Sequence, residues 1–140
     1  MEKIKVVLDP GAIMPTRAHE TDAGLDLYAM EDGGVPPFGS ALFDTGVHVG
    51  IPVGYVGLLT SKSGLMANSQ ITSRGTIDAG FVGSIRAVLF NHGNKFVHIK
   101  AGQKITQLVI LPIITPELEL VDSLEETERG TGGFGSSGMF

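Results

Sequence analysis

In the stretch SIRAVLF, residues 84–90, Ile85, Ala87 and Leu89 alternate with Ser84, Arg86 and Val88. Ile85, Ala87 and Leu89 fall on one face of an extended chain, because successive side chains of a strand point to opposite faces. This period of two residues predicts a half-buried β-strand.

The rest of the chain repeats this pattern in short pieces. Glycine interrupts the apolar segments every few residues, with 20 Gly and 7 Pro in total, and no long segment has helical periodicity. Strands are predicted over residues 4–8, 25–29, 42–51, 55–60, 84–91, 96–99, 104–111 and 118–121. Many short strands in a small chain indicate an all-β domain, either a barrel or a jelly roll.

One short helix is predicted after Lys62, in the stretch SKSGLMANS of residues 61–69. Ser63 is of a type that caps helix N-termini, and helix amides beside a cation can hold a phosphate. An ordinary capped turn is an equally simple interpretation of such a short segment.

Composition limits the class of protein. A length of 140 residues, 42% hydrophobic and 18% charged, is typical of one globular domain. The absence of cysteine excludes disulfides and agrees with a reducing compartment, so we expect a cytoplasmic protein. The N-terminus has no continuous apolar core of a secretion signal, and the longest apolar run, residues 108–114, is too short to span a bilayer. We therefore expect no membrane partner.

The charges are unevenly distributed. The net charge of -5 argues against nucleic acid binding. Between Asp44 and Glu117, however, Asp78 is the only acid, and the same interval holds six basic residues: Lys62, Arg74, Arg86, Lys95, Lys100 and Lys104. This pattern indicates a site for an anionic ligand with a single carboxylate base. The alternative is a chance distribution over solvated strand faces.

The C-terminal stretch RGTGGFGSSGMF, residues 129–140, has the glycine content of a flexible arm. Arg129 and Phe134 are unusual in a purely solubilising tail, since a cation and an aromatic ring on a tether can close over a charged planar ligand. We expect a β domain over residues 1–122 and an arm over 123–140. The GTGGFG match to the dinucleotide fingerprint lacks the strand and helix that the fingerprint needs.

Two other kinds of chemistry, aspartic proteolysis and metal binding by histidine, have some of their residue types in the chain. Asp44, Thr45 and Gly46 form the Asp-Thr-Gly triplet of aspartic proteases, in which two chains pair their carboxylates, but so short a match also arises as an ordinary turn. The four histidines, His19, His48, His92 and His98, lack metal-ligand spacing, so a histidine-built metal site is not expected.

Five blocks of sequence, in this order, resemble the five motifs of the trimeric dUTPase family. They are DAGLDLYA (22–29), SKSGL (61–65), GTIDAGFVG (75–83), AGQKITQLV (101–109) and RGTGGFGSSG (129–138). The resemblance runs from about Pro15 to Gly138 and is specific because all five blocks occur together.

The resemblance implies a β jelly roll that forms a homotrimer, with active sites at the subunit interfaces and the C-terminal arm closing over a site. It implies hydrolysis of dUTP to dUMP and pyrophosphate, with Mg²⁺ carried on the phosphates. Asp78 matches the general base that activates water for attack on the α-phosphorus, a role that needs little competing negative charge nearby.

The resemblance also assigns binding roles. Asp26 would hold the magnesium through water, and Phe81 would stack on the deoxyribose. The substrate contacts that the resemblance implies fall into three groups. At the phosphates or the attacking water they are Lys62, Ser63, Gly64 and Gln107. On and around the hairpin that reads the base they are Thr72, Gly75, Thr76, Ile77 and Arg86, and on the arm they are Arg129, Phe134, Gly135, Ser136 and Ser137.

Four positions depart from the family pattern. Lys62 stands where arginine is usual and loses its bidentate fork, and Phe81 stands where tyrosine is usual. Thr72 replaces a common asparagine, and Arg74 replaces a small residue or proline. Other functions compatible with the fold are a dCTP deaminase, which the intact Ile-Asp-Ala-Gly hairpin disfavours, and a regulatory protein that uses the nucleotide pocket as a sensor.

Overall fold

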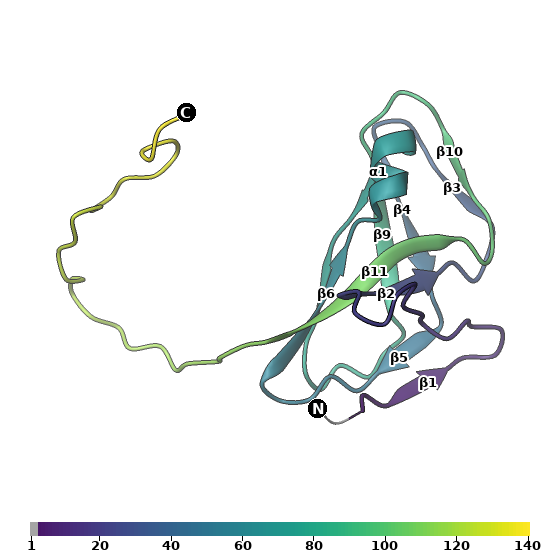
Figure 1. Ribbon diagram of the computed structural model, residues 1–140, viewed down its shortest axis with the longest axis horizontal. Coiled ribbons are helices and arrows are strands. Elements are labelled where there is room, and N and C mark those ends of the chain that lie inside the picture. The colour runs from purple at the N-terminus through teal and green to yellow at the C-terminus, as the bar shows by residue number, and fades with distance from the viewer. Residues whose placement is uncertain (1–2) are drawn as a thin grey trace.

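The computed structural model describes residues 3–140 and confirms the predicted all-β jelly roll (Figure 1). Its elements are β1 (Val6–Leu8), β2 (Gly24–Tyr28), β3 (Gly33–Val35), β4 (Ser40–Asp44), β5 (Val47–Val49), β6 (Tyr55–Thr60), α1 (Ser63–Ser69), β7 (Ile71–Ser73), β8 (Gly75–Ile77), β9 (Arg86–Asn91), β10 (Val97–Ile99) and β11 (Lys104–Pro112).

The strands pair antiparallel in two larger and two smaller sheets. The larger sheets have the orders β2-β11-β6-β8 and β4-β9-β7, and the smaller ones pair β1 with β5 and β3 with β10. Consecutive strands therefore often lie in different sheets, so the chain crosses repeatedly between layers. The long β11 is the central strand of the four-stranded sheet, between β2 and β6.

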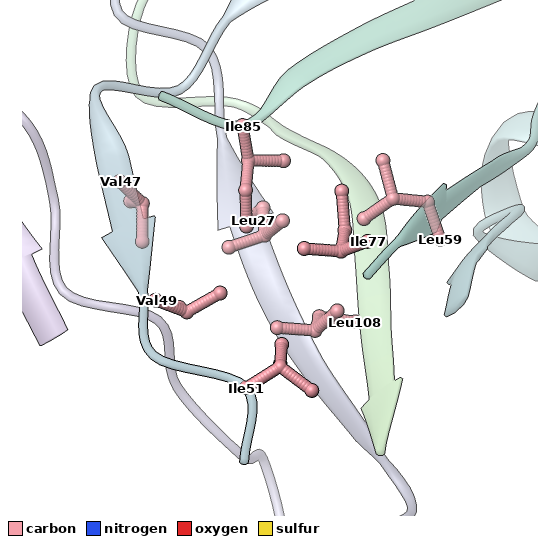
Figure 2. Close-up of a cluster of buried hydrophobic side chains, with 8 residues drawn as sticks. All are labelled: Leu27, Val47, Val49, Ile51, Leu59, Ile77, Ile85 and Leu108. Atoms are coloured by element: carbon pink, nitrogen blue, oxygen red, sulfur yellow. The ribbon is translucent and has the colours of Figure 1, made fainter. Parts of the chain in front are cut away.

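The alternation of residues 84–90 is confirmed: Ile85, Ala87 and Leu89 are all fully buried. They belong to two clusters of apolar side chains that form the core. One cluster, shown in Figure 2, consists of Leu27, Val47, Val49, Ile51, Leu59, Ile77, Ile85 and Leu108. Each large aliphatic side chain removed from water there stabilises the fold by about 1.5–3 kcal/mol.

The prediction of one strand over residues 42–51 is wrong, because the chain turns after Asp44 and forms two strands, β4 and β5. Gly46 has φ +66°, which favours glycine, and a Cβ there would lie 2.4 Å from the sulfur of Met30. The backbone N–H of Gly46 donates to Oδ1 of Asp44 at 2.9 Å. The Asp-Thr-Gly triplet therefore forms a turn that sends β5 into a different sheet.

Two further predictions about strands differ from the structure. The short β3 was missed because its sequence, GGV, has glycine where strands usually carry large residues; a Cβ on Gly34 would collide with the ring of Phe96. Residues 118–121 are not a strand in this chain, and Leu118 and Leu120 are 97% and 100% exposed. Within residues 3–140, no strand pairs with this segment of alternating apolar and polar side chains.

The predicted short helix is confirmed as α1, but Ser63 does not cap it. Lys62 occupies the N-cap position with an extended backbone and makes no side-chain capping bond, while Ser63 is already the first helical residue. The helix ends at Gln70, which is in the left-handed conformation with φ 55° and donates its N–H to the carbonyl of Met66.

The chain leaves the body after β11 and continues as an extended arm, as Figure 1 shows. The N–H of Ile113 donates to the carbonyl of Gly54 at 2.9 Å, and the backbone hydrogen bonds of residues 127–138 close local turns of the arm itself. Among residues 3–140, no helix is both long and apolar enough to cross a membrane. The cytoplasmic location expected from the sequence stays a prediction.

Candidate active site

A buried carboxylate, Asp26, lies on β2, an edge strand of the four-stranded sheet. It is 4% exposed. Its Oδ1 accepts a hydrogen bond of 2.5 Å from Nζ of Lys62, which immediately precedes α1, and its Oδ2 lies 3.2 Å from Nζ of Lys104 on β11. Two ammonium groups from different elements therefore share one carboxylate.

The two lysines keep Asp26 ionised. Burial by itself would raise the pKa of Asp26, but the hydrogen bonds and charges of Lys62 and Lys104 outweigh it, so the pKa lies below the ordinary value of 3.8. In the other direction, the Asp26 carboxylate raises the pKa of Lys104. The cluster of Asp26, Lys62 and Lys104 thus carries a net positive charge at neutral pH.

Replacing Asp26 with asparagine is expected to lower the free energy of unfolding by about 1–2 kcal/mol, because it leaves two cations without their partner. The loss is modest because the Lys62 and Lys104 side chains are 27% and 46% exposed and can turn to water. A lowered pKa contributes stability above the ordinary value of 3.8, and this stability is lost as pH falls through the folded-state pKa. Thermal melts from about pH 3 to pH 6 should therefore be less pH-dependent in Asp26→Asn.

Asp122→Asn is a matched control for this measurement, since Asp122 is an exposed carboxylate in the extended segment that follows β11. It should retain both the stability and the acid dependence of the unsubstituted chain. Equal melting curves for Asp26→Asn and Asp122→Asn would contradict the stabilising role of the Asp26 cluster.

Gln107 lies beside Asp26 on the neighbouring strand, and their backbones pair directly. Its Nε2 donates to the carbonyl of Ser61 at 2.9 Å, which ties β11 to the segment before α1. Gly24 makes room for this side chain, because a Cβ on Gly24 would lie 2.1 Å from Oε1 of Gln107. The glycine of the first sequence block is thus explained by a side chain from the fourth.

A network of hydroxyl groups holds the segment that carries Lys62. The Ser61 hydroxyl donates to the carbonyl of Ser73 and accepts from its N–H. The Ser73 hydroxyl is 2.7 Å from the Thr106 hydroxyl. The Thr106 hydroxyl also donates to the carbonyl of Thr60. Buried hydroxyls satisfied in this way fix β6, β7 and β11 relative to one another.

The predicted hairpin around Asp78 consists of the edge strand β8, which pairs with β6 alone, and the turn that follows it; the name Asp78 hairpin is kept for these two parts. Asp78 follows β8 directly and is exposed, and its carbonyl accepts the N–H of Phe81 at 3.1 Å to close a four-residue turn. Gly80 has φ +89°, as such a turn requires at its third position. Phe81 is 44% exposed, and its ring lies over Gly83, where a Cβ would be 2.7 Å from it.

A cavity of about 480 Å³ opens beside the base of this hairpin and is lined by residues of β6, β7, β8 and the end of β9. Thr72, Gly75 and Thr76, all predicted to contact the substrate, are among its lining residues. The Thr72 hydroxyl lies 2.7 Å from Nε2 of His92, which also lines the cavity. Ile77, the next residue of β8, is instead buried in the core.

Arg86 lies in a different place from these groups. It begins β9, where its backbone pairs with that of Asp44. The Asp44 carboxylate accepts hydrogen bonds from the Ser84 hydroxyl and the Gly46 N–H. Burial opposes ionisation of Asp44, but these bonds together with the charges of Arg86 and His48 lower its pKa. The Asp-Thr-Gly carboxylate is thus used within its own turn, which gives no support to the protease alternative.

One chain does not bring Asp26 and Asp78 together. Asp26 on β2 pairs with Gln107 on β11, and Gln107 pairs in turn with Thr60 on β6. On the other side of β6, Ile77 pairs with Gly57, three residues before Thr60, and Asp78 comes one residue after Ile77. Strands lie about 4.8 Å apart and rise about 3.3 Å per residue, so three strand spacings and four residues separate the two carboxylates by about 19 Å. The cluster of Asp26, Lys62 and Lys104 and the Asp78 hairpin are therefore separate on one subunit.

The predicted arm residues also lie apart from both groups (Figure 1). Nε of Arg129 donates to the carbonyl of Gly132 at 2.8 Å, within the arm. Phe134 has its ring fully exposed and φ +50°, a conformation unfavourable for a residue with a side chain. Gly135, Ser136 and Ser137 continue the same exposed segment.

Lys104 is the residue of this site that the sequence patterns did not identify. It belongs to the block AGQKITQLV, and it counts among the six cations of the acid-poor interval, but neither observation assigns it a partner. The pairing of β2 with β11 brings it to Asp26. A basic residue three positions before Gln107 was the only available signal.

Comparison with known proteins gives a consistent result. A family model described as dUTPase matches residues 11–138. The Deoxyuridine 5'-triphosphate nucleotidohydrolase of Gloeothece citriformis is 43% identical over 141 residues, covering 98% of this chain and 97% of that protein. The protein of the same description from Clostridium acetobutylicum is 41% identical over 140 residues, covering 98% and 96%.

Solved structures resemble the chain equally well. The dUTPase of Staphylococcus bacteriophage 80alpha with dUPNHPP superposes with a TM-score of 0.89 at 36% identity, over 99% of this chain and 100% of that one. A variant dUTPase from phage phi11 of S. aureus, described as revealing the coordination of a structural Mg(II) ion, has a TM-score of 0.81 at 34% identity and covers 89% of this chain and 100% of that one.

Proposed function

The chain belongs to the dUTPase family and is a dUTP nucleotidohydrolase, and we propose that Asp78 is the general base of its reaction. The observation that supports this role is the placement of Asp78: an exposed carboxylate on a glycine-bounded turn, two residues after Thr76 of the cavity lining, and alone among acids from residue 45 to 116. A general base needs a carboxylate within hydrogen-bond reach of the attacking water.

The proposed step is an in-line displacement at the α-phosphorus. Asp78 accepts a proton from water as the water oxygen bonds to the α-phosphorus. The bond from the α-phosphorus to the oxygen that bridges to the β-phosphorus breaks, and pyrophosphate leaves with that electron pair, so the products are dUMP and pyrophosphate. The residue types of Lys62 and Gln107 suit the phosphates and the attacking water, and Ser63 and Gly64 offer a hydroxyl and a backbone amide beside them.

The residues of the chain fit a magnesium ion that the nucleotide brings with it. Within residues 3–140, no three His, Cys, Asp or Glu side chains come together to hold a cation directly. Asp26, whose oxygens face two lysines, can orient a water on such an ion when Lys62 turns to a phosphate. Mg²⁺ bound to the triphosphate neutralises charge and polarises the phosphoryl groups.

The cavity beside the hairpin suits the deoxyuridine. Gly75, Thr76 and Ile77 offer backbone groups of an edge strand to the uracil, and glycine lets the base approach closely. Phe81 would stack on the deoxyribose and leave no space for a 2′-hydroxyl. Thr72 and its hydrogen-bond partner His92 take the place of the more usual asparagine at this cavity.

We further propose that the active enzyme is a homotrimer with sites between subunits. The separation of Asp26 from Asp78 in one chain supports this, because a triphosphate cannot contact both unless another copy supplies one of them. The exposed Leu118 and Leu120, in an alternating segment without a partner strand in the described part of the chain, favour burial against a neighbouring copy. The division into a body, residues 1–122, and an arm, residues 123–140, is part of this proposal.

A substrate panel tests the activity. The purified protein with magnesium should release pyrophosphate from dUTP at least about 100-fold faster, in kcat/KM, than from dCTP, dTTP or UTP, because each analogue leaves a polar group unpaired or adds a clashing one. Ammonia release from dCTP would instead identify a deaminase. The absence of pyrophosphate from dUTP would refute the proposed hydrolysis.

A further inference from the structure

The loop that follows Asp78 is attached to the rest of the fold at three consecutive places. The carbonyl of Val82 lies 2.7 Å from Nδ1 of His48. The Ser84 hydroxyl donates to the Asp44 carboxylate. The carbonyl of Ile85 then accepts both the N–H and the hydroxyl of Thr45, at 3.0 and 2.6 Å. Residues 44–48, which include the Asp-Thr-Gly triplet, thus form an anchor for this loop.

The attachment at Val82 is the one nearest to the reacting groups. Phe81 precedes it directly, and the turn bond from the Phe81 N–H to the Asp78 carbonyl connects it to the carboxylate. Val82 itself is 75% exposed, so packing does not hold it. The hydrogen bond from His48 is therefore a main constraint on where the Asp78 turn ends.

His48 faces a hydrogen-bond acceptor with each of its ring nitrogens. Nδ1 points to the carbonyl of Val82, and Nε2 is 2.9 Å from the carboxylate of Asp9, next to the end of β1. Neither a carbonyl nor an ionised carboxylate can donate a proton, so both ring nitrogens must carry hydrogen for both bonds to form. Only the imidazolium satisfies this geometry; a neutral ring keeps one bond and turns a lone pair toward the other acceptor.

The charges around His48 favour that form. The charged groups near it are Asp9, Asp44 and Lys5, with Arg86 on the other side of Asp44. The bond to the Val82 carbonyl raises the pKa of His48 most, and Asp9 raises it further, while partial burial acts weakly in the opposite sense. Lys5, which lines a small groove with His48, and Arg86 oppose this but make no hydrogen bond to the ring.

We propose that His48 is a positioning residue for catalysis: as an imidazolium it joins Asp9 on the N-terminal segment to Val82 and so holds the hairpin of Asp78 and Phe81 in its working position. The inference rests on the proposed role of Asp78. Loss of the proton from His48 releases one of the two bonds and loosens the hairpin, without removing any group that touches the substrate.

The direction of the pH effect follows from the raised pKa. The contribution of His48 is complete below the ordinary histidine value of 6.5 and is lost as pH rises through the higher pKa of the folded protein. Hairpin positioning therefore weakens as pH rises through the raised pKa of His48.

Kinetics of His48→Gln test this in the full-length enzyme. Near pH 6.5 its kcat/KM for dUTP with magnesium should be about tenfold below that of the unsubstituted enzyme, because a small misplacement of the reacting groups is costly. The difference should shrink toward about onefold as pH rises through the raised pKa of His48 and the ring of the unsubstituted enzyme becomes neutral. Titration of the nucleotide is common to both proteins and cancels in this ratio. His98→Gln, at an exposed histidine of β10, is the matched control and should show no such trend.

Nuclear magnetic resonance titration of the imidazole groups tests the same inference without activity. The signal absent in His48→Gln should titrate above the ordinary histidine value of 6.5 in the unsubstituted protein. Asp9→Asn keeps the shape and acceptor oxygen but removes the charge, so it should lower the His48 midpoint and move the alkaline decline in kcat/KM by the same amount. A ratio independent of pH, or an Asp9→Asn variant that leaves both quantities unchanged, would overturn the proposal. A failure of Asp78 as base would appear separately, as full activity of Asp78→Asn with the His48 titration intact.

Discussion

Asp78→Asn is expected to lower kcat for dUTP hydrolysis by about 10³-fold, which is typical for the loss of a positioned general base. Asparagine has nearly the same shape as aspartate but cannot accept the proton of the attacking water. Because Asp78 is exposed and the hydrogen bond that it accepts from Phe81 uses its backbone carbonyl, the side-chain change does not remove this contact. Steady-state release of pyrophosphate, measured with saturating dUTP and magnesium, gives the comparison.

Two measurements separate this outcome from a structural defect. The variant should bind a non-hydrolysable dUTP analogue with a dissociation constant within about threefold of that of the unsubstituted enzyme, since the base contributes mainly to the transition state. Asp32→Asn is the matched control: Asp32 is also an exposed carboxylate, and its Oδ1 accepts the N–H of Ala101, a bond that asparagine can retain. A near-normal kcat in Asp78→Asn would mean that another group activates the water.

The sequence predicted the parts of the fold that depend on local patterns. The alternation of residues 84–90 depends only on which side chains face the core, and β6 has the predicted bounds, residues 55–60. The division between β4 and β5 was missed because Thr45 belongs to a strand-favouring run, and only the positive φ of Gly46 interrupts it. Such a turn is determined by contacts with Met30 and Ala12, which lie far away in the sequence.

The candidate site was predicted in its components but not in its arrangement. Asp26 and Lys62 were identified as separate contacts of metal and phosphate, whereas the structure pairs them with each other and adds Lys104. The pairing of β2 with β11 creates this contact, and no pattern within either strand encodes it. For the same reason, the sequence contained Asp44 and His48 without indicating that both anchor the loop after Asp78.

Removal of residues 129–140 is the second change with a large expected effect, about a 10²-fold loss in kcat/KM for dUTP. It removes a guanidinium suited to phosphate oxygens, on Arg129, and an aromatic ring suited to the uracil, on Phe134. Phe134 is exposed with φ +50°, so the arm gives up little packing when it moves over a bound nucleotide. Melting temperature and oligomer size should be unchanged, because the hydrogen bonds of this segment close turns within the arm.

Mixed oligomers would show which subunit the arm serves. Full-length Asp78→Asn keeps the arm and lacks the base, whereas the truncated chain keeps the base and lacks the arm. If base and arm at one site come from different subunits, coexpression of the two inactive chains in equal amounts should restore about a quarter of the sites, because each site then draws its two parts independently. If both parts come from one chain, no mixture can complete a site and activity stays at the level of the two parents. We expect recovery, because the extended arm leads away from the body of its own chain (Figure 1).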